Sequence, residues 1–447
     1  MISTNSTNST IAAIATAPGR GAIAVIRISG PGALGAYKLL TNSTATPTPN
    51  HIKPAWIYED KQKIDHSMMV YFKAPNSFTG EDVVEIHCHG SKVVQRNILD
   101  VLFAAGIEAA KPGEFSERAY YNGKIDVAQA EAIMELVSAE NTQLARLATR
   151  QLAGEFSKQI KNISGEVTKL GATLAADFDF SEEDLPLLDS TMIAEALASI
   201  ITKINIIKAG SEILPKLREG INVVLIGLPN AGKSTLLNTL LGFDRSIVSS
   251  QAGTTRDTIN ETAELGGINY QFIDTAGLNS KPGAVEKIGI EKSIANIKSA
   301  DIILLLIEPG QESKTKAFIE SKHLIEYIDS PKTIKVFTKS DIGNNKSKGI
   351  QISALKKSGI KKLTDKIISL SLDQTQTSLQ ILTERQLNII NRVEQALTKL
   401  EDEAQNLSFD IISAELELVA KDLNELTGEH ANQQIIDSIF RNFCIGK

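Results

Sequence analysis

The sequence predicts a multidomain protein that combines α/β domains with an all-α part, and three observations carry this prediction. The chain has 447 residues, which suits two or three domains. Short β-branched apolar runs alternate with helical stretches over residues 218–372, as in a largely parallel sheet. On both sides of that block, apolar residues recur at steps of three and four, as in amphipathic helices.

Residues 1–122 are expected to form an N-terminal α+β domain. Two strands are expected in IAAIATA (11–17) and GAIAVIRIS (21–29), and two more in SMMVYFKAP (67–75) and DVVEIHCHG (82–90). Alternate side chains of a strand face opposite ways, so His87 and His89 share a face and Cys88 points away. Two histidines do not make a structural zinc site. Core packing of Cys88 beside a hydrogen-bonded His89 is the favoured interpretation, with a metal as the alternative.

Two helical segments flank the central block, at residues 123–217 and 373–447. The first has a face made of Ile160, Ile163, Val167, Leu170 and Leu174, and the second has one made of Ile412, Leu416, Val419, Leu423 and Leu426. An acidic stretch, DFDFSEEDLP (177–186), interrupts the first segment at Pro186, and SLDQTQTSLQ (371–380) reads as a linker. The α/β block at 218–372 is therefore predicted to be an insertion between two helical segments that pack together.

Composition limits the possible classes of protein. A formal net charge of −6 argues against a nucleic-acid clamp, so any RNA contact must be local or supplied by a partner. Two cysteines, Cys88 and Cys444, cannot form a disulfide framework and favour a reducing compartment. We find no apolar run near the length of a transmembrane helix, and MISTNSTNST lacks the features of a signal peptide. A soluble cytoplasmic protein without a membrane partner is expected, with an organelle transit peptide as a weaker alternative.

A phosphate-binding loop is expected at GLPNAGKS (227–234), which follows the strand INVVLI and precedes a helical stretch. Gly227 and Gly232 let backbone N–H groups close around phosphates. Lys233 brings a positive charge to the β and γ phosphates, and the Ser234 hydroxyl can bind Mg²⁺. A glycine-containing turn before a helix is the alternative interpretation, which the motifs that follow make improbable.

Three further motifs occur in the order of a GTP-binding domain. DTAG (274–277) ends a strand, where a carboxylate can bind Mg²⁺ and the N–H of Gly277 can meet a γ-phosphate. In TKSD (338–341), Asp341 can accept from the two donors of guanine, which adenine lacks. In ISA (352–354), Ser353 and Ala354 would support the guanine oxygen. Thr338 stands where an Asn usually ties the base loop to the phosphate loop, which affects affinity more than the choice of base.

The mode of hydrolysis is less ordinary, because Leu278 occupies the position where Ras-type enzymes carry a water-orienting Gln. GTTRD (253–257) would supply Thr255 as a second Mg²⁺ ligand. The Asn230 oxygen, with carbonyls of SIVSSQA, could hold a monovalent cation where an arginine finger's charge would stand. Glu286 is a candidate to orient water, and on composition alone a solvated helix-start carboxylate is the more probable interpretation.

The expected catalytic groups are thus Glu286 and Lys233. The residues expected to contact GTP are Asn230, Ala231, Gly232, Lys233, Ser234, Thr235, Ser249, Ser250, Gln251, Ala252, Gly253, Thr254, Thr255, Asp274, Thr275, Ala276, Gly277, Thr338, Lys339, Asp341, Ser353 and Ala354.

Along nearly its whole length the sequence resembles the MnmE (TrmE) family of tRNA modification GTPases. The resemblance rests on IAAIATAPGRGAIAVIRISGP, SFTGEDVVEIHCHG and KPGEFSERAYYNGKIDVAQAEAI in the N-terminal part. Further along it rests on DFDFSEED, GLPNAGKSTLLN, IVSSQAGTTRD, VEKIGIE, LNELTG and the terminal FCIGK. A phosphate loop joined to a terminal CIGK makes this combination highly specific.

The resemblance implies a GTP-hydrolysing component of the system that builds an aminomethyl-type group, such as carboxymethylaminomethyl, on C5 of the wobble uridine of tRNA. A flavin-dependent partner of the MnmG (GidA) type would form a heterotetramer or larger complex with it. The N-terminal domain would form the homodimer and bind 5-formyltetrahydrofolate or a related tetrahydrofolate. K⁺, bound by Asn230, Ser249, Gln251 and Thr254, would drive pairing of the GTPase domains, and Glu286 matches the family's water-orienting Glu.

The resemblance further places folate contacts at Arg27, Glu85, Lys124 and Lys447. A carboxylate such as Glu85 can accept from the paired donors of a pterin, and the anionic tail of folate suits Arg or Lys. A surface pair of Arg27 with Glu85 and a helix-start Lys124 are the ordinary alternatives. The tail RNFCIGK is not a prenylation signal, because Gly446 and Lys447 do not suit one. It is expected to reach the folate site, with Cys444 close to the one-carbon chemistry.

A regulatory switch GTPase in ribosome assembly or at membranes, with no chemistry on tRNA, is the alternative function. Such a switch needs no pterin-binding residues, so the N-terminal residues discriminate between the two hypotheses.

Overall fold

The computed structural model describes residues 9–179, 189–242, 260–274, 293–343, 349–371, 379–404, 406–429 and 433–447. These residues form two compact units. One contains residues 1–134, 150–203 and 383–447, and the other contains residues 135–149 and 204–382. Each unit is interrupted in sequence by the other, as an insertion requires.

The first unit begins with a six-stranded sheet of order β3-β4-β5-β2-β1-β6, in which only the β1–β6 pair is parallel. Helices α1 and α2 cover one face, because their apolar residues share a core with Ile26, Ile86 and Met69. The strands are β1 (Ile11–Ile14), β2 (Ile23–Ser29), β3 (Lys53–Glu59), β4 (Gln62–Phe72), β5 (Val83–His89) and β6 (Glu108–Ala109), and the helices are α1 (Ala33–Thr41), α2 (Lys92–Ala104) and α3 (Glu114–Tyr121).

The four strands expected from the sequence are confirmed, whereas β3 and β6 were missed. β3 is an edge strand with a proline and mostly exposed residues, so its alternation is weak. Cys88 is buried, and His89 Nδ1 lies 2.6 Å from Asp65 Oδ1, as expected for a core cysteine beside a hydrogen-bonded histidine. Among the described residues, no group of three or more metal-ligating side chains forms a metal site.

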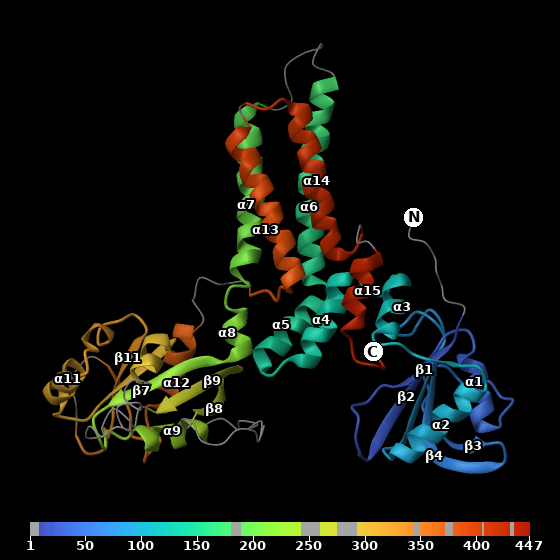
Figure 1. The fold of residues 1–447 in the computed structure, drawn as a ribbon, viewed down its shortest axis with the longest axis horizontal. Helices are drawn as coiled ribbons and strands as arrows, with labels where there is room; N and C mark the ends of the chain where they lie inside the picture. The colour runs from blue at the N-terminus through green and yellow to red at the C-terminus, as the bar shows by residue number, and fades with distance from the viewer. Residues whose placement is uncertain are drawn as a thin grey trace. The chain divides into compact units, whose positions relative to one another are not determined.

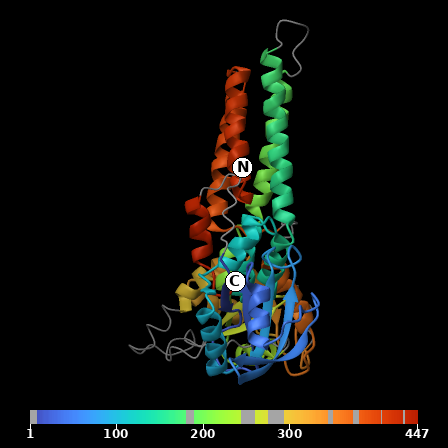
Figure 2. The same ribbon diagram turned by 90° about the vertical axis from the view of Figure 1, so that its right-hand side faces the viewer.

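Helices that precede and follow the α/β block in the sequence complete the first unit (Figures 1 and 2). In these views α6 and α14 run side by side. Ser413 Oγ donates to the Gly171 carbonyl at 3.0 Å, and Ser164 Oγ donates to Asn424 Oδ1 at 2.8 Å. The predicted packing of the two helical segments is therefore confirmed. The helices of the two flanking segments are α4 (Val127–Ser138), α5 (Thr142–Leu152), α6 (Glu155–Asp179), α7 (Ser190–Ala209), α8 (Leu214–Glu219), α13 (Glu384–Glu403), α14 (Phe409–Thr427) and α15 (Gln433–Arg441). Of these, α8, most of α5 and the last residues of α7 belong to the second unit.

One helical stretch among the described residues, Ser190–Glu219, is long and apolar enough to cross a membrane, which the sequence reading did not anticipate. Within it, Ile193, Leu197, Ile200 and Ile204 are buried at steps of three and four. That periodicity is typical of a helix that packs one face into a protein core.

The second unit is built on a six-stranded sheet of order β12-β11-β10-β7-β9-β8, parallel except for β8. Both faces are covered, and the central strands β7 and β10 are almost continuously buried, as parallel strands usually are. The elements are β7 (Ile221–Gly227), α9 (Lys233–Leu241), β8 (Asn260–Leu265), β9 (Ile268–Asp274), β10 (Ile302–Ile307), α11 (Glu312–Ser321), η2 (Ile325–Tyr327), β11 (Thr333–Phe337), β12 (Ile350–Gln351) and α12 (Ile360–Ser371).

The alternation of strands and helices and the largely parallel sheet expected for residues 218–372 are confirmed, and the polar edge strand β8 was missed. Residues 135–149 also belong to this unit, where Thr142 Oγ1 donates to Glu264 Oε1 at 2.5 Å and Gln143 N donates to the Gly267 carbonyl at 2.8 Å. The end of α4 and most of α5 thus hold the β8–β9 hairpin.

Candidate functional site

The loop between β7 and α9 has the backbone of a phosphate cradle. Asn230 and Gly232 both have positive φ, at 66° and 89°, and Gly232 directly precedes the first turn of α9. Lys233 Nζ donates to the carbonyls of Gly227 at 3.1 Å and Leu228 at 3.2 Å, which holds the ammonium across the loop. Burial lowers the pKa of Lys233, and the Asp274 carboxylate opposes that shift. The loop presents backbone donors and one desolvated cation, which together suit an anion.

Asp274 and Ser234 form a pair of oxygen ligands beside this loop. The register of the parallel pair β7–β9 places Asp274 opposite Leu225, at the carboxyl end of its strand. The Ser234 hydroxyl lies 3.4 Å from Asp274 Oδ2. Asp274 Oδ1 is buried and has no hydrogen-bond partner among the described residues. A carboxylate oxygen left without a donor beside a hydroxyl fits Mg²⁺, which prefers oxygen ligands.

A pocket of about 200 Å³ adjoins the phosphate loop at the carboxyl ends of β11 and β12. Its lining includes Gly232, Thr235, Lys339, Asp341 and Ala354. A hydrogen bond with Ser353 lowers the pKa of Asp341, so this carboxylate is ionised at neutral pH. Its exposed oxygens can therefore accept hydrogen bonds from the two adjacent donors of guanine, the ring N–H and the exocyclic amine.

Thr338 does not make the hydrogen bond by which an Asn at this position would link the base loop to the phosphate loop. It is buried, and its backbone N–H and hydroxyl both point to the Ile307 carbonyl, at 2.9 Å and 3.5 Å. A Cβ atom added at Gly232 would lie 4.0 Å from Thr338 Cβ, so a side chain at position 232 would bring the two loops into van der Waals contact at this point. The backbone of the base loop is instead fixed by Ser340 N, which donates to the Ile352 carbonyl at 3.1 Å.

The structure thus brings together the described residues that the sequence singled out for GTP. Asn230, Ala231, Gly232, Lys233, Ser234, Thr235 and Asp274 lie on the phosphate side, and Thr338, Lys339, Asp341, Ser353 and Ala354 lie at the pocket. The remaining predictions fall outside the described residues. These are Ser249, Ser250, Gln251, Ala252, Gly253, Thr254, Thr255, Thr275, Ala276, Gly277 and Glu286.

A second cluster of predicted residues lies on the sheet of the first unit. Arg27 on β2 and Glu85 on β5 are cross-strand partners, and Arg27 Nε and Nη2 lie 2.9 Å and 2.8 Å from Glu85 Oε1. Their side chains remain 21% and 18% exposed, so the ion pair stays accessible to a ligand. Glu85 Oε2 has a weaker neighbour in His87 Nε2, at 3.5 Å. Arg27 and Glu85 thus form an ion pair, which was the alternative to a role in folate binding. A ligand that binds at this site would have to share the Glu85 carboxylate with Arg27.

The chain's last residues reach this pair. Gly446 has a φ of 93°, and a Cβ atom there would meet the Ile14 carbonyl oxygen at 2.1 Å, so the tail turns tightly against β1. Arg27 Nη1 lies 3.5 Å from the Gly446 carbonyl oxygen. Burial lowers the pKa of Lys447, with Cys444 opposing and Arg27 reinforcing the shift. Phe440 and Phe443 are buried and anchor the tail, while Cys444 is exposed.

Lys124 lies between α3 and α4, and its Nζ donates to the carbonyl of Pro75, in the loop between β4 and β5, at 3.1 Å. Two aromatic residues that the sequence reading did not select complete the surroundings of Arg27. Its guanidinium carbon lies 5.5 Å from the centre of the Phe78 ring and 5.7 Å from that of Phe115. In the sequence, Phe78 is a single aromatic residue in the polar stretch NSFTGED, and this was the only sign that it could have a role at the site.

Comparisons with known proteins agree with this organisation. A family model described as the MnmE helical domain matches residues 127–444, and one described as the GTP-binding protein TrmE N-terminus matches residues 10–124. A protein of Aquifex aeolicus (strain VF5) named tRNA modification GTPase MnmE is 35% identical over 448 residues, which cover 98% of this chain and 99% of the relative.

Proteins with the same name give similar matches. The one from Natranaerobius thermophilus is 35% identical, and the one from Francisella tularensis subsp. tularensis is 36% identical. Each alignment covers 99% of this chain and 100% of the relative. One family model covers most of the chain, and the relatives match the chain from end to end. The phosphate loop also lies between two helical segments that pack together. The chain therefore belongs to the MnmE (TrmE) family.

Proposed function

We propose that this protein is the GTP-hydrolysing component of a system that modifies C5 of the wobble uridine in tRNA. The observation that carries the proposal is the single sheet edge at which Lys233, Ser234, Asp274 and Asp341 converge. The Lys233 ammonium suits the phosphates of GTP, and the oxygens of Ser234 and Asp274 suit the Mg²⁺ that accompanies them. The Asp341 carboxylate suits the guanine base. Relatives of the same length are named tRNA modification GTPases, which supports the tRNA role.

The N-terminal cluster supports a second part of the proposal, a bound 5-formyltetrahydrofolate or related tetrahydrofolate as the one-carbon source. Glu85 offers an acceptor for a pterin, and Arg27, Lys124 and Lys447 offer charges for its anionic tail. The folate would supply the one-carbon unit, while these residues bind and orient it. Cys444 is exposed on the tail that reaches Arg27, within the same group of residues.

Hydrolysis would be completed when two GTPase domains pair in a homodimer with K⁺. Asn230, Ser249, Gln251 and Thr254 would hold the cation, Thr255 would join Ser234 on Mg²⁺, and Glu286 would orient water. Asn230 lies in the phosphate loop with a left-handed backbone, and its exposed side-chain oxygen can bind a cation. A flavin-dependent partner of the MnmG type and tRNA would complete a cytoplasmic complex.

The decisive experiment is an assay of the purified protein with GTP, a flavoprotein partner, a tetrahydrofolate donor and tRNA. Nucleoside mass spectrometry is expected to show a wobble uridine enlarged by an aminomethyl-type group, and a Lys233→Ala variant should abolish both GTP turnover and the product. Unchanged wobble uridines, both in this assay and in cells that lack the protein, would favour a regulatory switch GTPase.

A second assay separates the potassium mechanism from the tRNA function. GTP turnover is expected to be much faster in K⁺ than in Na⁺ and to be lost in Glu286→Ala, with nucleotide binding retained. Equal rates in the two salts, or full turnover by Glu286→Ala, would remove these parts of the mechanism and leave the tRNA assay unaffected.

A further inference from the structure

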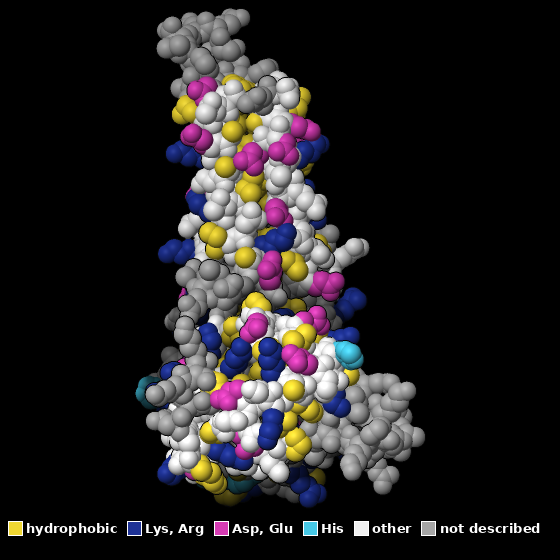
Figure 3. All heavy atoms as spheres, turned by 90° about the vertical axis from the view of Figure 1, so that its left-hand side faces the viewer, with side chains coloured by type: hydrophobic (Ala, Val, Ile, Leu, Met, Phe, Trp, Pro, Cys, Tyr) yellow, Lys and Arg dark blue, Asp and Glu magenta, His cyan; other side chains and the backbone are white. Residues whose placement is uncertain are grey.

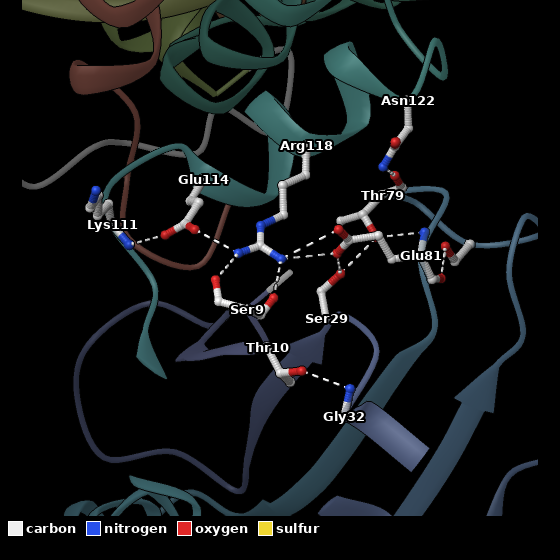
Figure 4. A network of polar contacts seen from close by, with 11 residues as sticks. Ser9, Thr10, Ser29, Gly32, Thr79, Glu81, Lys111, Glu114, Arg118 and Asn122 are labelled. Atoms are coloured by element: carbon white, nitrogen blue, oxygen red, sulfur yellow. Dashed lines mark hydrogen bonds and ion pairs between the residues drawn. The ribbon is translucent and has the colours of Figure 1, made fainter. Parts of the chain in front are cut away.

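Arg118 is the centre of a buried polar network beside the N-terminal site (Figure 4). This side chain of α3 is 5% exposed. Its Nη1 lies 2.8 Å from the Ser9 carbonyl and 3.2 Å from Glu81 Oε2, and its Nη2 lies 2.8 Å from Glu114 Oε1. Figure 4 shows the guanidinium between the two carboxylates. A buried cation with two carboxylate partners has the pairing that burial of its charge requires.

Through Glu81 this network reaches the loop between β4 and β5, residues 73–82. Glu81 Oε2 also accepts from Ser29 Oγ at 2.7 Å, and the Ser29 and Thr79 hydroxyls lie 2.7 Å apart. Asn122, just after α3, donates to the Thr79 carbonyl at 2.7 Å. The loop is thus fixed on one side to β2 and on the other to α3.

The same loop carries Phe78, whose ring covers the Arg27 guanidinium. Phe78 is 38% exposed, whereas Phe115, the other ring against Arg27, is fully buried. A ring that is both exposed and held next to a cation can stack on a flat ligand. Phe78 is followed directly by Thr79, and Glu81 lies three residues on, so the position of the ring depends on the network.

We propose that Arg118 is a positioning residue. Through Glu81 and Thr79 it fixes the 73–82 loop, so that Phe78 stands over Arg27 as an aromatic wall for an anionic cofactor of the tetrahydrofolate class, whose pyrimidine ring is flat. The identity of the cofactor rests on the proposed function, whereas the fixing of the loop does not. Arginine is needed because its planar fork serves Glu81, Glu114 and the Ser9 carbonyl together, which a single ammonium cannot do.

The test uses the full-length protein and the variants Arg118→Lys and Phe78→Leu. Arg118→Lys keeps the charge and loses the fork, and Phe78→Leu removes the ring and leaves the network intact. Arg385→Lys is the matched control, because Arg385 is a partly buried arginine that contacts Glu131 at 2.9 Å in a different part of the unit. Binding of 5-formyltetrahydrofolate, GTP turnover and hydrogen exchange of the amides of residues 76–82 are measured for each.

Both test variants are expected to bind 5-formyltetrahydrofolate about tenfold to a hundredfold more weakly, as loss of a charged hydrogen bond or a stacking ring implies. Arg118→Lys should also speed exchange of the loop amides, whereas Phe78→Leu should not. Arg385→Lys should bind the folate like the wild type, and all three should keep GTP turnover. If Arg118→Lys does not fold, Glu81→Gln replaces it, because the amide keeps the shape and loses the charge.

The two possible failures are distinguishable. Wild-type folate affinity in Arg118→Lys or in Phe78→Leu, or unchanged loop exchange in Arg118→Lys, would overturn the positioning role. If the wild type binds no folate while Arg118→Lys still loosens the loop, the folate part of the proposed function is wrong and the loop-fixing role of Arg118 stands.

Discussion

The two cysteines show how the surroundings of a single residue decide its chemistry. Cys88 lies on the core side of β5, where burial and the nearby Asp65 carboxylate raise the pKa of its thiol to about 11. Cys444 is exposed on the C-terminal tail. Since the thiolate is the reactive form of cysteine, these environments predict very different reactivities.

Alkylation with iodoacetamide at pH 8 is therefore expected to label Cys444 and to spare Cys88. A pKa of about 11 leaves about 0.1% of the Cys88 thiol ionised at pH 8, and the thiolate fraction rises about tenfold per pH unit up to that pKa. Peptide mass spectrometry measures both rates, with Cys444→Ser as the control. Rapid labelling of Cys88 in the native protein would contradict its place in the core.

Asp341 carries the prediction about base selectivity. An Asp341→Asn change replaces one acceptor by a donor, so guanine loses a charged hydrogen bond and GTP affinity should fall about tenfold to a hundredfold. Xanthosine triphosphate, which has an oxygen in place of the guanine amine, should gain affinity. Competition binding of the two nucleotides measures the switch, and Asp365→Asn on the exposed side of α12 is the control. Unchanged preference would place the base elsewhere.

At the scale of elements, the C-terminal tail depends on one backbone conformation. The amphipathic helix α15 ends at Arg441, Phe440 and Phe443 are buried, and Gly446 then turns the chain against Ile14 and Ala15. Because a residue with a side chain both disfavours that φ and clashes with a backbone oxygen, the turn specifically requires glycine.

Gly446→Ala is expected to detach the last residues from β1. The left-handed backbone alone costs about 1–2 kcal/mol, and the contact with the Ile14 carbonyl oxygen adds to that cost. Limited trypsin digestion should then cleave faster after Arg441, and intact mass spectrometry detects the shortened chain. Gly35→Ala is the matched control, because a Cβ atom there meets nothing within 4 Å. Equal digestion rates would show that the tail tolerates the change.

At the scale of the whole molecule, two units with separate cores carry the two candidate sites. The nucleotide residues lie in the unit containing residues 204–382, and the Arg27 cluster lies in the unit containing both chain ends. On the side of the protein shown in Figure 3, basic and acidic side chains are interspersed, in keeping with a net charge of −6. A general electrostatic attraction for RNA is therefore not expected from the protein alone.

Thermal unfolding should show two transitions that respond to different ligands. GDP with Mg²⁺, at about 100 times its Kd, should stabilise only the nucleotide-binding unit by about 2.7 kcal/mol. A tetrahydrofolate should raise only the other transition. Differential scanning calorimetry measures both, and Lys233→Ala should lose the nucleotide shift alone. A single transition raised by both ligands would mean that the units unfold as one.

Much of the fold was readable in the sequence because its signals are local. The buried strands β7, β9, β10 and β11 are short apolar runs, and the faces of α6 and α14 repeat at helical spacing. The edge strands β3 and β8 escaped because exposed strands carry mixed residues. The placement of residues 135–149 beside the β8–β9 hairpin also escaped, because it is made by hydrogen bonds between distant segments.

By itself, the sequence determined the family resemblance and predicted the inserted α/β block, the phosphate loop and the roles of Asp274 and Asp341, because these follow from residue types at fixed spacings along one chain. It also pointed to Arg27, Glu85, Lys124 and Lys447 through a family resemblance. Only the tertiary structure decided that Arg27 and Glu85 pair with each other, that the Phe78 ring lies against Arg27, and that Arg118 bonds to Glu81 in the 73–82 loop. These arrangements join residues far apart in sequence, and no local pattern encodes contacts that exist only once the chain has folded.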